Sequence, residues 1–150
     1  MSGLIGSAGS KSGLLGETEL DYETGSWTPN TNSQGNLTFS IQSAQYTKVG
    51  RLVTVQAYLE GNNNGSSNVD YKIYGLPFTA LANASPQGET FFVGSVNTSS
   101  SNSGTGDNDM VCRVAGGSTN LYFCENPQVS IKQDAIDHAH TIFSITYFSD

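Results

Sequence analysis

The sequence predicts an all-β fold, an antiparallel β-sandwich or jelly roll that forms a single domain. Ser, Thr, Asn and Gly make up 64 of its 150 residues, and 10% of the residues are aromatic. This composition is typical of short strands joined by turns, with aromatic and β-branched residues available to build a core. Because no long segment repeats its apolar residues at the helical period, we expect about eight strands and no helix.

Alternation of apolar and polar residues with a period of two marks the individual strands. It is clear at 37–42 and at 53–60, and shorter runs occur at 71–73 and 91–96. After 71–73, Pro77 is expected either to end the pairing ladder or to restrict it to a sheet edge, because proline has no N–H to donate.

The last strand is expected at 141–148, and it carries apolar residues on both faces. Ile142 and Phe148 share one face, and three apolar residues share the other. Such a strand is predicted to be central in its sheet or to lie in a subunit interface. Segments 61–68 and 98–109, which are rich in Ser, Asn and Gly, are expected to be exposed loops.

Charge and hydropathy exclude several classes of partner. The chain has 13 acidic and 6 basic residues and a net charge of -7, which should repel nucleic acids and anionic membranes. No apolar run approaches the roughly 18 residues that a membrane-spanning helix needs. The N-terminal segment does not have the organisation of a secretory signal either. We therefore expect neither nucleic-acid binding nor membrane insertion, and no cofactor.

Residues 1–20 form a separate segment with an internal repeat. Ser2-Gly-Leu-Ile-Gly6 returns as Ser12-Gly-Leu-Leu-Gly16, so two bulky apolar pairs are each flanked by glycine. The repeat favours an extended arm that docks on another protein, although an unordered leader is the plain alternative. The docking residues would be Leu4, Ile5, Leu14 and Leu15. Residues 21–150 would then form the β head.

The two cysteines, Cys112 and Cys124, lie in a predicted hairpin with strands at 110–115 and 120–124 and a turn at 116–119. Folding the hairpin about the serine of this turn sets the cysteines opposite each other. A cross-strand disulfide is then feasible, because non-hydrogen-bonded pairs approach to about 4.5 Å between Cα atoms. Two reduced thiols that serve as small hydrophobic residues are the alternative.

His138 and His140 are the one candidate metal pair. In an extended segment both side chains point to the same side. Two ligands are too few for a tight site on one chain, but three copies around a threefold axis would offer six imidazoles to a transition metal. Solvated histidines are the alternative. Asp107 and Asp109 resemble part of a calcium loop that lacks its other ligands.

Catalysis has no evident site in the sequence, which lacks the nucleophile, phosphate-loop and metalloprotease motifs. Its closely spaced carboxylates, such as Glu17 and Glu19, lie in or beside the arm, whereas a glycosidase must hold its two carboxylates at a fixed separation of about 5 to 9 Å. We expect a protein that is not an enzyme.

Ligand contacts are expected from the two long loops. The candidates are Asn63, Asn64, Asn102 and Asp107. Solvated turns explain the same residues without any ligand. The aromatic residues Trp27 and Tyr46 are assigned to the core or to the junction of arm and head.

Three separated segments resemble a known module in the same order. They are Asp21-Tyr-Glu-Thr-Gly-Ser-Trp-Thr-Pro29, Tyr46-Thr-Lys-Val-Gly-Arg-Leu-Val-Thr-Val55 and Gly75-Leu-Pro-Phe78. This pattern resembles a module of tailed-bacteriophage structural proteins, which commonly forms the C-terminal head of tail fibres and minor tail proteins. The resemblance covers about residues 20 to 80 and extends more loosely to the C-terminus.

The resemblance implies a jelly-roll-like β-sandwich that assembles as a homotrimer in the host cytoplasm and is displayed on the virion, on the phage tail. Residues 1–20 would bind other tail or virion proteins, and the head would recognise the host surface, with a host glycan as a fitting ligand. The arm is shorter than the shaft that often precedes such heads. A head decoration protein, or a tail or baseplate joining protein with a purely architectural role, is therefore the alternative.

Overall fold

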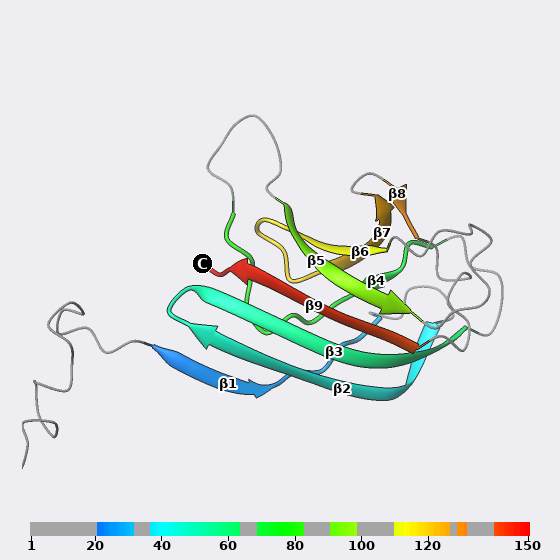
Figure 1. Ribbon diagram of the computed structural model, residues 1–150, viewed down its shortest axis with the longest axis horizontal. Coiled ribbons are helices and arrows are strands. Elements are labelled where there is room, and N and C mark those ends of the chain that lie inside the picture. Colours follow the sequence, from blue (N-terminus) through cyan, green and yellow to red (C-terminus); the bar gives the residue numbers. More distant parts are fainter. Residues whose placement is uncertain are drawn as a thin grey trace, which may run out of the picture.

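The computed structural model describes residues 21–31, 37–63, 69–82, 91–98, 110–126, 129–131 and 140–150. These residues contain no helix and form one antiparallel sheet of nine strands that curls into a half-barrel (Figure 1). The predicted all-β class is confirmed. The arm, with Leu4, Ile5, Leu14 and Leu15, lies outside the described residues.

The strands, in chain order, are β1 (Tyr22–Ser26), β2 (Leu37–Val49), β3 (Leu52–Asn63), β4 (Lys72–Ile73), β5 (Phe91–Thr98), β6 (Val111–Ala115), β7 (Leu121–Asn126), β8 (Val129–Ser130) and β9 (His140–Phe148). Their order in the sheet is β1-β2-β3-β9-β5-β6-β7-β4, and β8 pairs with β7. Since β9 lies between β3 and β5, the last strand is central, which is one of the two predicted positions. Pro77 follows β4 outside any strand, as expected.

The core lies on the inner, concave side of the half-barrel. Phe143 of β9 is its centre: the ring of Trp27 meets it edge-on at a centroid distance of 6.4 Å, and that of Phe123 does so at 5.5 Å. Tyr71 stacks on Phe123 at 4.3 Å. These contacts join β9 to β7 across the curl, and they confirm Trp27 as a core residue. Tyr46 packs at the edge of the same core.

β2 and β3 are longer than the predicted strands at 37–42 and 53–60, and they pair as a hairpin. The turn between these strands contains Gly50, whose φ of 58° is a left-handed conformation that glycine adopts without steric cost. At the far end Gly61, Asn62 and Asn63 continue β3, where they pair with the first residues of β2. The prediction that a loop begins at Gly61 was therefore wrong, because pairing with β2, which continues past an irregularity between Phe39 and Ile41, outweighs the turn preference of Gly and Asn.

The hairpin of β6 and β7 exists, but its predicted register was wrong by one residue. The register pairs Val114 with Leu121, so the hairpin is centred between residues 117 and 118, and within the turn the Ser118 N–H donates to the Ala115 carbonyl. Cys112 consequently faces Phe123, and Cys124 faces Val111. The two side chains leave opposite faces of the hairpin, and both cysteines are free and buried. The structure therefore contains the reduced thiols and not the disulfide.

Candidate functional site

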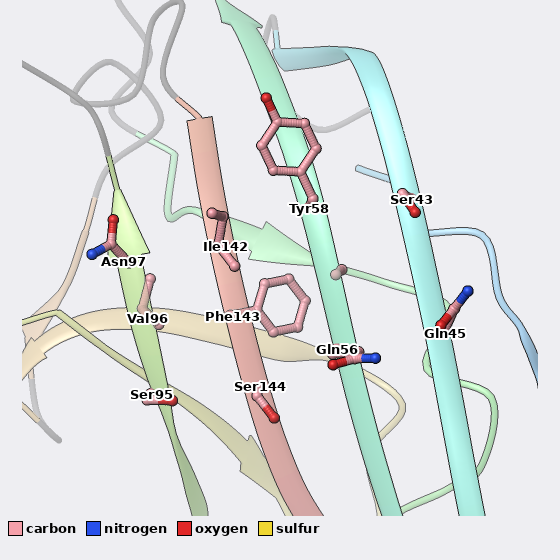
Figure 2. A pocket seen from close by; sticks show the side chains of 11 residues that line it. Ser43, Gln45, Gln56, Tyr58, Ser95, Val96, Asn97, Ile142, Phe143 and Ser144 are labelled. Carbon is pink, nitrogen blue, oxygen red and sulfur yellow. The ribbon is translucent and has the colours of Figure 1, made fainter.

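The outer face of the half-barrel is the surface on which polar side chains gather. It consists of alternate residues of β2, β3, β9 and β5, which the register places in straight rows across the strands. One row runs Gln45, Gln56, Ser144 and Ser95, and the next runs Ser43, Tyr58, Ile142 and Asn97. Figure 2 shows these side chains standing on the sheet. Apart from the half-buried Tyr58, they are exposed.

A groove of about 440 Å³ lies over these two rows. We call it the amide groove, because three of the side chains that line it are carboxamides, namely Gln45, Gln56 and Asn97. Three serine hydroxyls, from Ser43, Ser95 and Ser144, and the hydroxyl of Tyr58 complete the polar side chains that line it. None of its lining residues carries a charge. Its volume falls within the roughly 300–1,000 Å³ of typical ligand sites.

Tyr58 stands at one end of the amide groove in a fixed position. Its hydroxyl lies 2.6 Å from Nδ1 of His140, and the two rings stack at a centroid distance of 5.5 Å. A carboxylate oxygen of Glu60 lies 3.9 Å from the same imidazole nitrogen. The hydrogen bond and the stacking together restrict the rotamers of Tyr58, so its ring is held at the wall of the groove before any ligand arrives.

A second hollow, of about 470 Å³, adjoins the first toward β1. Gln45 and Gln56 line both hollows, so this pair forms the ridge between them. The second hollow is lined further by Thr24, Thr47 and Thr54, which are again neutral hydroxyl residues. The uncharged surface therefore continues over two adjoining hollows.

The opposite end of the outer face is apolar. We call it the end row, formed by Tyr22, Val49, Leu52 and Phe148, which pair in register across β1, β2, β3 and β9. Tyr22 is 66% exposed, Phe148 50% and Leu52 41%. A row of exposed apolar side chains on adjacent strands is the kind of surface that other proteins cover.

The structure describes one of the four predicted ligand residues, Asn63. Asn64, Asn102 and Asp107 lie outside the described residues, as does Asp109. Asn63 is the last residue of β3, and it belongs to a strand instead of the predicted loop.

The predicted metal pair is only partly described. His138 lies outside the described residues, and His140 opens β9, where it contacts Tyr58 and Glu60. Within the described ranges, no three His, Cys, Asp or Glu side chains gather to hold a metal ion.

The strongly shifted titratable groups belong to the core and not to the outer face. Burial raises the pKa of Cys112 to about 12 and that of Tyr147 to about 12. Burial also raises the pKa of Tyr71. All three groups are kept neutral by desolvation, which is the behaviour of structural residues.

Comparisons with family models, with curated proteins and with solved structures found no match. In the described part of the chain, no helix is long and apolar enough to cross a membrane.

Proposed function

We propose that this chain is a noncatalytic structural protein of a tailed-phage virion, a tail-fibre or fibre-tip subunit displayed for recognition of the host surface. The proposal starts from the resemblance to phage tail modules. Each of the three segments that carry this resemblance contains a residue that is buried or that forms a turn. Trp27 is in the core, Gly50 forms the turn of the β2–β3 hairpin, and Leu76 is buried directly after Gly75, whose φ is 86°.

The observation that best supports the proposal is the division of the outer face. Its apolar end row begins with Tyr22, the first residue of β1, which follows the arm closely in sequence. Its other end is the uncharged amide groove. A displayed subunit needs one surface that attaches it to its assembly and another that stays accessible, and the two ends of one sheet fit these two tasks.

The finer architecture that we propose is a jelly-roll-like sandwich in a homotrimer. In favour of the sandwich, the curl brings β7 over β9, so the core contacts between Phe123 and Phe143 lie between two parts of the sheet that face each other. In favour of the trimer, an oligomer would cover the end row. Burying the exposed half of Phe148 would contribute about 1 kcal/mol for each copy.

Light scattering on the purified full chain tests the assembly, and binding of the fluorescently labelled chain to a panel of bacterial strains tests recognition. We expect a trimer that adsorbs to some strains. The variant Phe148→Ser should lower the mass, whereas Ile142→Ser should leave it unchanged. Ile142 is a matched control, because it lies on the same face of β9 and is 51% exposed against 50% for Phe148.

The architectural alternative predicts a different result from the same experiment. A trimer that adsorbs to no strain would favour a head decoration or a joining protein, for which the arm is the functional part. A monomer that adsorbs would refute the homotrimer but keep the recognition role. A chain that is monomeric and adsorbs to nothing would contradict the proposed function.

A further inference from the structure

We propose that the amide groove on β2, β3, β9 and β5 binds a neutral oligosaccharide. This inference rests on the proposed function and adds to it the class of ligand and the place where the ligand binds. It also moves the site away from the predicted loop residues to the outer face of the sheet.

The lining chemistry selects a ligand that donates and accepts hydrogen bonds but carries no charge. A carboxamide such as that of Gln45, Gln56 or Asn97 offers both an acceptor oxygen and a donor nitrogen, and a serine hydroxyl does the same. Sugar hydroxyls have the same dual character. An anionic or cationic ligand would be desolvated in the groove without meeting an opposite charge among its lining residues, which is unfavourable.

The groove also provides an apolar surface at the position where a sugar ring would lie. Ile142 pairs with Tyr58 on one side and with Asn97 on the other, and it is 51% exposed. Tyr58, which stands beside Ile142 in Figure 2, is held by its hydrogen bond to His140 and by its stacking on the same ring. The C–H face of a pyranose can pack on such a surface while its hydroxyls reach the neighbouring amides. Because the aromatic ring is already ordered, little entropy is lost on binding.

The two adjoining hollows indicate an oligosaccharide instead of a monosaccharide. Gln45 and Gln56 face each other across β2 and β3 and line both hollows. A chain of sugars crossing this ridge would place successive units in the two hollows. The threonine hydroxyls of the second hollow, from Thr24, Thr47 and Thr54, would meet the next unit.

A second copy of the chain is the competing occupant of this surface. The core of a protein interface is apolar, and each amide buried there without a partner costs free energy. The end row offers that apolar character, whereas the row of Gln45, Gln56, Ser144 and Ser95 does not. We therefore assign the end row to assembly and the amide groove to the glycan.

The test is a titration of the ¹⁵N-labelled full chain with maltohexaose, chitohexaose and a linear mannan fragment as neutral probes, and with a sialylated oligosaccharide as an anionic probe. We expect at least one neutral probe to shift the side-chain amide signals of Gln45 and Gln56. Gln45→Ala and Gln56→Ala should each weaken binding about two- to tenfold, the effect of one lost neutral hydrogen bond. Gln42→Ala is the matched control, since Gln42 is an exposed residue of β2 in the register row of buried Leu59, outside both hollows.

Three results would overturn the proposal. The first is binding of the sialylated probe alone, and the second is binding of a neutral probe that neither glutamine variant weakens. The third is no binding of any probe. Cell adsorption of the same preparation separates the two proposals, because adsorption without glycan binding removes only the glycan site, whereas loss of both also removes the recognition function.

Light scattering of one further variant tests whether a second copy of the chain covers the groove. Gln56→Arg places a charge at the centre of the outer face. If this variant lowers the mass in light scattering, a second copy covers the groove and the glycan proposal is wrong. We expect the mass to stay that of the wild type while binding of the neutral probe is lost.

Discussion

Gly94 is a residue at which a single added methyl group should disturb the sheet strongly. It lies in β5 opposite Cys112 and faces the core. A Cβ atom at this position would stand 2.3 Å from the backbone oxygen of Ser144, 2.6 Å from Cβ of Ile145 and 2.8 Å from Sγ of Cys112. The nearest of these atoms belongs to the backbone of the central strand β9, so no change of rotamer can move it away.

The substitution Gly94→Ala therefore forces β5 away from β9 or distorts both strands. Overpacking of a core costs about 1–3 kcal/mol, and a contact with rigid backbone belongs at the upper end, about 3 kcal/mol. For a domain of this size each kcal/mol lowers the melting temperature by about 2–4 °C, which gives a decrease of about 6–12 °C.

Thermal unfolding followed by circular dichroism measures this decrease, with Gly50→Ala as the control. Gly50 has a φ of 58° and nothing within 4 Å of its added Cβ, so it tests backbone strain without a steric clash, and we expect a loss of about 1 kcal/mol. Adding Cys112→Ala to Gly94→Ala should restore little stability, because the sulfur is not the closest neighbour. A Gly94→Ala variant as stable as the wild type would refute the reasoning, and so would full rescue by the second substitution.

Three further predictions follow from the same structure. The thiol of Cys112, whose pKa burial raises to about 12, should react with a thiol-specific chromogenic reagent at pH 8 only as fast as the chain unfolds. Burial raises the pKa of Tyr147 and of Tyr71 above the ordinary value of 10.0 in the folded chain. Their contribution to the free energy of unfolding is therefore complete below pH 10 and falls as the pH rises toward 12. In a urea-unfolding series over this pH range, the stability of Tyr147→Phe should depend less on pH than that of the wild type. Gly25→Ala places its Cβ 2.8 Å from the ring of Tyr46, which can rotate away, so the loss should be about 1 kcal/mol and clearly smaller than for Gly94→Ala in the same assay.

The all-β class and most strands could be predicted, because apolar and polar residues alternate along a strand when one face of its sheet is buried. Val53, Val55 and Leu59 are fully buried, as their spacing requires when one sheet face is inside. β1 escaped prediction because its Tyr22–Ser26 segment has no buried alternate residues and is held instead by pairing with β2. Pairing partners that are distant in sequence leave no local pattern.

The hairpin of β6 and β7 shows a second limit of sequence reasoning. The turn segment was recognised from its glycines, but a turn can be centred on a residue or between two residues. The pairing of Val114 with Leu121 shows that this hairpin has the second arrangement. That difference of one residue reverses which face each cysteine occupies, and it changes a feasible disulfide into two separate buried thiols.

The amide groove was missed for a related reason. Gln45, Gln56, Ser144 and Ser95 occupy the polar positions of four strands, and each one alone is an ordinary solvated residue. Only the register brings them into one row. The sequence signal that was available is a local absence of charge: the outward positions 43, 45, 56, 95, 97 and 144 carry only Ser, Gln and Asn.

β9 provides the sharpest way to separate the two roles that we assign to the outer face. Ile142 and Phe148 lie on the same side of this strand, six positions apart, with nearly equal exposure of 51% and 50%. If assembly and glycan binding occupy opposite ends, Phe148→Ser should lower the mass of the particle and leave the affinity per chain for a neutral hexasaccharide unchanged. Ile142→Ser should leave the mass unchanged and weaken the binding of the hexasaccharide. A general loss of stability cannot produce these two separate effects, because it would reduce both the mass and the glycan affinity in both variants. Equal effects of the two substitutions would mean that the outer face is one surface with one occupant.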